Sequence, residues 1–169
     1  MGYNTCFEGC IEINKPVDEE TKKLLKGLAS TRRMRRDVEI LAKRLNIDMK
    51  KCIELYGEEG EFYFHDDNVY GQTKTEDIIT YNDPPKSQPG LWCQWILDEN
   101  INSLVWDEQD KFYEFEEWMI YLVNILSKRN YILNGEISWE GEDQDDKGTI
   151  IVKDNVVSVL DKRFTVSYT

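Results

Sequence analysis

The chain has 169 residues and a formal net charge of −12, with 33 Asp and Glu against 21 Lys and Arg and a single histidine. This length is most simply one domain, and a hydrophobic content of 40% suffices for a packed core, which excludes a disordered chain. The acidic excess excludes a protein that coats nucleic acid with its whole surface, because such binding depends on Lys and Arg.

The N-terminal third begins with a strand and a short helix. Residues 3–13 are rich in strand formers and predict a first strand that ends before Pro16. Asp18 is placed to cap a helix that extends to about Ala29, and the acidic residues that follow it suit the positive end of a helix dipole.

Two more helices are predicted before residue 58. Apolar residues recur on one helical face over 33–45, with Ser30 or Thr31 as the cap. Asp48 can cap a further short helix that ends at Gly57.

The middle of the chain predicts short strands around a stiff connector. Residues 61–65 and 78–81 read as strands. The sequence DPPKSQPG at 83–90 cannot form regular structure, because its three prolines lack N–H donors. Residues 91–97 and 103–107 then predict a hairpin.

The last third combines a long helix with three strands. Apolar residues spaced three and four apart predict a helix over 111–128. Strands are predicted over 131–140, 148–153 and 156–168, the last interrupted near Asp161. This order, with hairpins in place of βαβ alternation, predicts an α+β fold: a mixed or mainly antiparallel sheet with two to four helices packed on one face.

Charge is unevenly distributed along the chain. Residues 15–51 contain 12 Lys and Arg against 6 Asp and Glu, and the remainder contains 9 against 27. We therefore expect a single domain, 1–169, with a basic helical segment over about 15–57 and an acidic α+β body over about 58–169. An acidic body favours a basic partner, and nucleic-acid-binding proteins are common basic partners.

Four arginines cluster within five positions: Arg32, Arg33, Arg35 and Arg36. Guanidinium groups pair bidentately with oxyanions, so the cluster is suited to bind phosphate or an acidic protein surface. The alternative is internal, with the arginines balancing the chain's own acidic loops. Residues 41–55 faintly resemble a helix-turn-helix, but the second helix is short and carries Glu54, so direct reading of DNA is not expected.

The densest acidic run is EGEDQDDKG at 140–148. A calcium loop that began at Asp143 would have Lys147 at its fifth position, and lysine cannot bind a cation, so no metal site is expected. The run is either a solvated hairpin loop or an acidic surface for a basic partner. The candidate partner-binding residues are Glu140, Glu142, Asp143, Asp145 and Asp146, with Trp92 and Trp95 as aromatic anchors. Asp98, Glu99, Asp107, Glu108 and Asp110 would extend this surface if the hairpins end on the same side.

Catalysis, cofactors and membranes are not expected. The only histidine, His65, has no evident partner, and no nucleophile elbow, phosphate-binding loop or metalloprotease motif is present. A pair of carboxylates that converges in the fold is the remaining route to an enzyme. No apolar run approaches the roughly 20 residues that cross a bilayer, and residues 1–13 lack the pattern of a signal peptide. A cytoplasmic protein with reduced cysteines is therefore expected.

Several blocks resemble a known family: EGEFYF, DPPKSQPGLWCQW, SLVWDEQDKFYEFEEWMIYLVN and YILNGEISWEGEDQDDKGTIIVKDNVV. They resemble a family of small acidic, uncharacterised proteins found in phages and mobile elements of gut bacteria, and the likeness covers most of residues 58–157. The resemblance implies a genomic setting and carries no fold, activity or site residues. Small acidic phage proteins include inhibitors of host defence, anti-CRISPR proteins among them.

These observations predict a non-enzymatic, protein-binding inhibitor of the anti-defence type. Its acidic loops would bind a larger basic host protein that itself binds nucleic acid, and a CRISPR effector is the most specific candidate. The alternative is a small-ligand or nucleotide-binding protein, in which the arginine cluster holds phosphate while Trp92 or Trp95 stacks on a base. The sequence indicates no oligomeric state.

Overall fold

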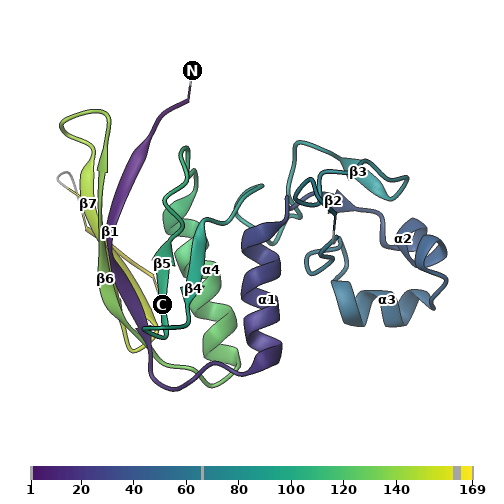
Figure 1. Ribbon diagram of the computed structural model, residues 1–169, viewed down its shortest axis with the longest axis horizontal. Helices are drawn as coiled ribbons and strands as arrows, with labels where there is room; N and C mark the ends of the chain where they lie inside the picture. The colour runs from purple at the N-terminus through teal and green to yellow at the C-terminus, as the bar shows by residue number, and fades with distance from the viewer. Residues whose placement is uncertain (1, 66, 162–164, 169) are drawn as a thin grey trace. The chain divides into compact units, whose positions relative to one another are not determined.

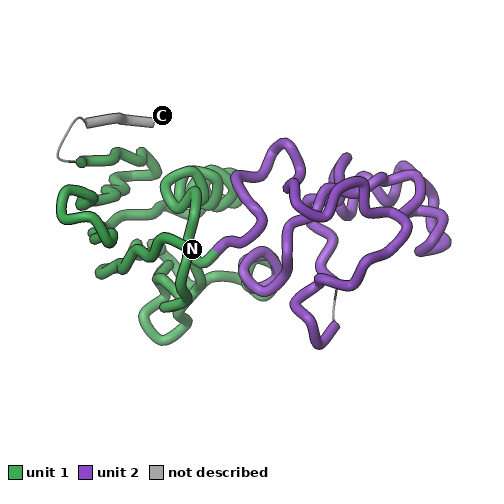
Figure 2. Tube along the Cα trace, turned by 90° about the horizontal axis from the view of Figure 1, so that it is seen from above, with its two compact units in different colours: residues 1–22, 94–169 green, residues 23–93 purple. Residues whose placement is uncertain are grey.

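The computed structural model describes residues 2–65, 67–161 and 165–168 (Figure 1). The chain forms two compact units (Figure 2). Unit 1 comprises residues 1–22 and 94–169, and unit 2 comprises residues 23–93. Helix α1 (Glu19–Ser30) begins in the first unit and ends in the second.

Unit 1 is built on a seven-stranded antiparallel sheet with the strand order β4-β5-β1-β6-β7-β8-β9. The strands are β1 (Thr5–Ile13), β4 (Trp95–Asp98), β5 (Ser103–Trp106), β6 (Leu133–Gly141), β7 (Lys147–Lys153), β8 (Val156–Asp161) and β9 (Thr165–Tyr168). The N-terminal strand β1 lies between β5 and β6, which follow it by about 90 and 120 residues.

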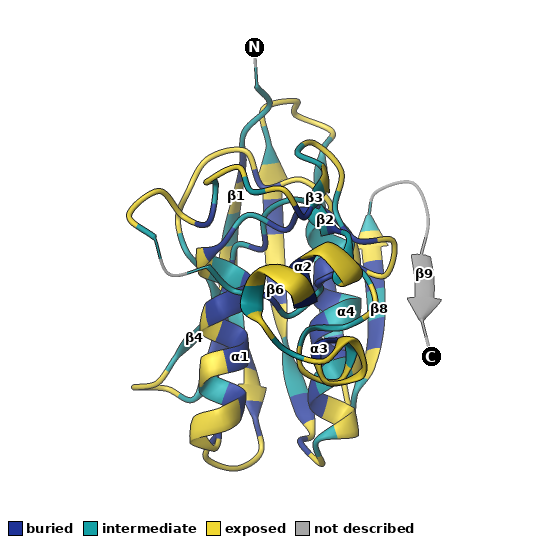
Figure 3. Ribbon diagram, turned by 90° about the vertical axis from the view of Figure 1, so that its right-hand side faces the viewer, coloured by how far each residue is buried: buried dark blue, intermediate teal, exposed yellow. Residues whose placement is uncertain are grey.

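One face of this sheet forms the core of unit 1 with helix α4 (Phe115–Lys128) (Figure 1). Alternate strand residues are buried, as expected where one face is packed and the other faces water (Figure 3). The sheet contributes Ile11, Leu104, Ile137, Ile150 and Val159, and the helix contributes Trp118, Met119, Leu122, Val123 and Leu126.

Unit 2 contains two short helices and a two-stranded sheet. Helices α2 (Val38–Leu45) and α3 (Met49–Tyr56) share a core of Leu41, Ala42, Cys52 and Tyr63. Strands β2 (Arg35–Arg36) and β3 (Ile78–Thr80) pair in the antiparallel sense.

The predicted α+β class is confirmed, and so are several helix caps. Asp18 accepts a hydrogen bond from the backbone N–H of Thr21 at 2.8 Å, at the start of α1. Asp48 accepts one from Lys51 N at 3.2 Å, at the start of α3.

The predicted helix over 33–45 is wrong in its first part. The backbone at Arg35–Arg36 is extended and pairs with β3, and α2 begins only at Val38. The cap is Asp37, whose carboxylate accepts hydrogen bonds from Glu39 N and Ile40 N, in place of Ser30 or Thr31.

The predicted strand over 61–65 is also absent, and the segment is a turn followed by irregular backbone. The carbonyls of Glu61 and Tyr63 accept hydrogen bonds from the Arg33 guanidinium, so they are occupied by a side chain and not by a neighbouring strand. The long helix begins at Phe115, later than the predicted residue 111. In the predicted strand over 156–168, residues 162–164 lie outside the described residues.

The boundary between the two units does not lie near residue 57, where the sequence predicted a change from basic to acidic character. Residues 58–93 group with the basic segment, because their backbone and carboxylates bind its arginines. Unit 2 therefore contains 12 Lys and Arg and 12 Asp and Glu, for a net charge of zero. Unit 1 contains the other 9 Lys and Arg and the other 21 Asp and Glu, so the whole net charge of −12 belongs to it.

Candidate functional site

The acidic side chains of unit 1 gather at one end of its sheet. Gly141, the last residue of β6, pairs with Thr5 at the start of β1, and Asp161, the last residue of β8, pairs with Gly148. The segment that follows β5 leaves from this same end, since β5 runs antiparallel to β1 (Figure 1).

We call residues 107–117, 140–147 and 161 the acidic end. It contains twelve Asp and Glu, and its only basic residues are Lys111 and Lys147. Asp107, Glu108 and Asp110 thus join the predicted acidic run.

Asp98 and Glu99 do not extend the acidic end. They lie at the turn between β4 and β5, next to Ser103, which pairs with Glu12 near the end of β1. This is the opposite end of the sheet.

The turn between β6 and β7 is held by side chains from outside it. The Tyr3 hydroxyl donates to Asp146 Oδ2 at 2.7 Å, and Trp139 Nε1 donates to Asp146 Oδ1 at 3.0 Å. The same hydroxyl accepts a hydrogen bond from Asp143 N at 3.1 Å, and Gly141 N donates to the Asp146 carbonyl at 2.8 Å. Asp146 is therefore a structural residue of the turn, although it was predicted to bind a partner.

The other predicted acidic residues of the turn are exposed. Glu142, Asp143 and Asp145 present their side chains to solvent, while Glu142 Oε1 also accepts a hydrogen bond from Asn4 N at 2.8 Å. Glu140 forms an exposed ion pair with Lys147 at 2.7 Å. A turn whose backbone is held in place is suited to present carboxylates to a cationic surface, because little backbone freedom is lost on binding.

The first turn of α4 brings further carboxylates close to this hairpin. Burial, and then repulsion from Glu117, Asp161 and Asp146, raises the pKa of Glu116 above its ordinary value. Burial and repulsion from Glu117 likewise raise the pKa of Glu114. These groups gain protons at a higher pH than ordinary glutamates, so the negative charge of the acidic end decreases early as pH falls.

We expect Tyr3→Phe to loosen the turn, because it removes the donor to Asp146 and the acceptor for Asp143 N. Hydrogen exchange in residues 140–147, followed by mass spectrometry, should become roughly ten-fold faster. Tyr70→Phe, which removes an exposed hydroxyl in unit 2, is the control. Equal exchange rates in the two variants would contradict the inference that Tyr3 holds the turn.

The two predicted aromatic anchors differ in exposure. Trp95 is 1% exposed and belongs to the core of unit 1, where its Nε1 donates to the carbonyl of Phe115 at 2.8 Å. The prediction that Trp95 binds a partner is therefore wrong. Trp92 is partly exposed and belongs to unit 2.

Two of the four clustered arginines are buried and bind within unit 2. Arg33 is 2% exposed and donates to Glu61 O at 2.8 Å and to Tyr63 O at 2.9 Å. Arg36 is 3% exposed and pairs with Asp77 at 2.6 Å. These two guanidinium groups have the internal role, and only Arg32 and Arg35 remain partly exposed.

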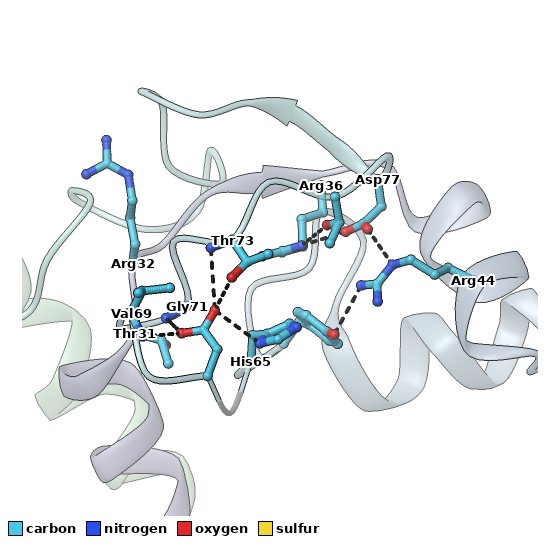
Figure 4. A network of polar contacts seen from close by, with 12 residues as sticks. Thr31, Arg32, Arg36, Arg44, His65, Val69, Gly71, Thr73 and Asp77 are labelled. Carbon is cyan, nitrogen blue, oxygen red and sulfur yellow. Dashed lines mark hydrogen bonds and ion pairs between the residues drawn. The ribbon is translucent and has the colours of Figure 1, made fainter.

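A buried carboxylate organises the centre of unit 2 (Figure 4). Asp77 is fully buried and accepts hydrogen bonds from Arg36 Nη1 at 2.6 Å and Arg44 Nε at 2.7 Å. Arg44 Nη2 also donates to the Tyr63 hydroxyl at 3.0 Å, and the Arg36 guanidinium lies 4.6 Å from the centre of the Tyr63 ring. Sequence reasoning missed Asp77 and Arg44, because their partners are far away along the chain.

Asp67 organises a neighbouring loop of unit 2 (Figure 4). The Thr73 hydroxyl donates to it at 2.7 Å, and the backbone N–H groups of Val69 and Gly71 also donate. These hydrogen bonds, that of Thr73 first, lower the pKa of Asp67 to about 2. His65 Nδ1 lies 3.3 Å from the same carboxylate but forms no hydrogen bond with the described residues.

Several classes of site are not found in the part of the chain that the structure describes. No group of three or more His, Cys, Asp or Glu side chains is placed to hold a metal ion across residues 2–65, 67–161 and 165–168. In the same residues no helix has both the length and the apolar character needed to cross a membrane. No protein-family model, curated protein or solved structure was found to match this chain.

Proposed function

We propose that the protein is a non-enzymatic inhibitor that binds a larger, basic host protein through the acidic end of unit 1. The observation that carries this proposal is the gathering of twelve carboxylates and two amines at one end of a sheet. Because Tyr3 and Trp139 hold the central turn, its exposed carboxylates offer a fixed array of negative charge. Such an array suits a protein groove that normally binds phosphates.

The division of charge between the units supports the same proposal. Unit 1 has a net charge of −12 and unit 2 has none, so the electric field of the chain originates mainly in one unit. A concentrated field of this kind accelerates association with an oppositely charged partner. The attraction should weaken with added salt, since the screening length is only about 8 Å at physiological ionic strength.

The partner class is a protein that binds nucleic acid, because its groove is already basic. The resemblance to phage proteins makes a CRISPR effector the first candidate within this class. Occupation of its nucleic-acid channel by the acidic end would exclude the guide or the target strand. This gives an inhibitor that needs neither cofactor nor catalytic residue.

A matched pair of charge-reversal variants tests the proposal. The first changes the exposed residues of the turn, Glu142, Asp143 and Asp145, to lysine. The second makes the same change at three exposed strand residues of the same unit, Glu8, Glu12 and Glu136. The two variants have identical net charge, so a difference between them reports the position of the charge.

Binding is first measured by affinity pull-down from a bacterial lysate at low and high salt, then by titration with the purified partner. We expect the turn variant to bind roughly 100-fold more weakly and the strand variant to lose less than about three-fold. Duplex DNA should compete with the wild-type protein for the partner. Equal losses in the two variants, or binding that duplex DNA does not reduce, would contradict the proposal.

A further inference from the structure

The proposed function makes no use of a cationic and aromatic cluster in unit 2. The Arg32 guanidinium lies 4.3 Å from the centre of the Tyr81 ring and 5.8 Å from that of Trp92. Lys74 Nζ lies 5.0 Å from the centre of the Tyr81 ring. We call these four residues the Arg32 cluster.

Hydrogen bonds fix the position of this cluster. Arg32 Nε donates to the Tyr81 carbonyl at 3.0 Å, and Arg32 Nη2 donates to Asn82 Oδ1 at 3.1 Å. The Tyr81 hydroxyl donates to Gln72 at 3.0 Å. None of the residues that the structure describes accepts a hydrogen bond from Arg32 Nη1. The guanidinium points away from the buried network around Asp77 (Figure 4). Arg32 is therefore held in place with part of its fork still available.

A second arginine flanks the same segment of chain. Arg35 pairs with Thr80 across β2 and β3, and its backbone N–H donates to the Asp83 carbonyl at 3.1 Å. Its side-chain Nε is buried and has no hydrogen-bond partner among the described residues. Because this N–H is enclosed by the protein, Arg35 contributes positive charge to the segment and not a direct contact to a ligand.

The acidic residue of this segment does not neutralise the two arginines. Asp83 Oδ2 accepts a hydrogen bond from Thr80 Oγ1 at 3.1 Å. None of the ion pairs formed by the described side chains joins Asp83 to Arg32 or Arg35. The local charge is therefore positive, although unit 2 as a whole is neutral.

We propose that the Arg32 cluster forms a binding site for a nucleotide, either free or at the end of a strand. The Arg32 guanidinium, whose Nη1 is still available, holds a phosphate, because guanidinium groups pair strongly with oxyanions. The Trp92 ring, partly exposed beside Arg32, stacks on the base, because every base presents an aromatic face. A long nucleic acid is disfavoured by the net charge of −12 on the other unit of the same chain.

Calorimetric titration with ADP, compared with inorganic phosphate and a ten-nucleotide single-stranded DNA, tests the site. We expect ADP to bind more tightly than phosphate, and Arg32→Ala and Trp92→Ala to weaken ADP binding by at least about ten-fold. Trp92→Phe keeps a ring and should lose less than about three-fold. Lys50→Ala removes an exposed cation of the same unit and should leave affinity unchanged.

The variant Arg32→Lys distinguishes a loss of binding from a loss of folding. It keeps the charge but removes the planar fork, so ADP binding should still weaken while circular dichroism and the melting temperature stay near those of the wild type. If ADP binds more tightly than the oligonucleotide, the ligand of the site is a free nucleotide. If the oligonucleotide binds more tightly, the ligand is the end of a strand. Equal binding of ADP and phosphate, no binding of either nucleotide probe, or an equal loss in Lys50→Ala would overturn the proposal. The charge reversals in the acidic turn should leave ADP binding intact, so this site and the proposed function fail separately.

Discussion

Asp77→Asn is expected to lower the free energy of unfolding of unit 2 by about 3–5 kcal/mol, the usual cost of removing one partner from a buried ion pair. Asp77 is fully buried, and its carboxylate compensates Arg36, which is 3% exposed. An amide retains the approximate shape but not the charge, so two guanidinium groups would lose their counter-ion. Few single substitutions in this unit should cost more.

The measurement is urea unfolding, combined with hydrogen exchange to separate the two units. Exchange should accelerate in peptides from 31–63 and remain near the wild-type rate in peptides from 115–160. Glu76→Gln is the matched control, because Glu76 is the exposed neighbour of Asp77. A loss in Asp77→Asn no greater than that in Glu76→Gln would show that the buried pair is not a main support of unit 2.

The same residue makes unit 2 sensitive to acid. Burial by itself would raise the pKa of Asp77, but hydrogen bonds from Thr75, Arg36 and Arg44 outweigh it and lower the pKa. A carboxyl group with a lowered folded-state pKa stabilises the fold above about pH 4, and this stabilisation is lost as pH falls through the lowered pKa. Asp77→Asn should therefore remove part of the acid sensitivity of unit 2 along with its stability at neutral pH.

Trp95→Ala should lower the free energy of unfolding of unit 1 by about 3–5 kcal/mol, as expected for a large aromatic side chain removed from a core. The Trp95 ring packs edge-on against Phe7 at 5.0 Å and Phe112 at 4.9 Å, measured between ring centres. Its Nε1 hydrogen bond to the carbonyl of Phe115 ties strand β4 to the first residue of α4. The substitution removes both kinds of contact.

Thermal and urea unfolding of three variants would check this result. Trp95→Phe keeps a ring and should lose only about 1–2 kcal/mol. Trp106→Ala, at the partly exposed residue paired with Trp95, should lose less than Trp95→Ala. In the partner-binding assay Trp95→Phe should bind as the wild type does. A selective loss of partner binding in a stably folded Trp95→Phe would instead restore this tryptophan as an interface anchor.

Periodic patterns predicted much of the secondary structure, and contacts between residues far apart along the chain explain the error at the start of α2. The apolar period that predicts a helix over 33–45 holds from Val38 onward, but it includes Met34 on the same face. Arg36 lies within the predicted helix, yet it extends toward Asp77, 41 residues further along the chain. A helical pattern contains no information about that distant carboxylate, so the start of the helix was misplaced.

The candidate site was predictable only in part for the same reason. The run at 140–146 is visible in the sequence because its residues are adjacent. Glu116 lies close enough to Asp146 and Asp161 to repel them. This proximity depends on the order of the strands in the sheet, which the sequence does not show. The opposite placement of Asp98 follows from the register between β4 and β5. The sequence did not indicate that Trp95 is buried and Trp92 partly exposed.

The central place of β1 in its sheet has a consequence for biosynthesis. Residues 5–13 are made before unit 2, yet their hydrogen-bonding neighbours are β5 and the far later β6. The contiguous stretch 23–93 has all of its own residues available much earlier. During translation unit 2 can therefore fold before β1 has either neighbour, since β5 and then β6 leave the ribosome later. Strand β1 is thus synthesised before unit 2 but reaches its native position after it.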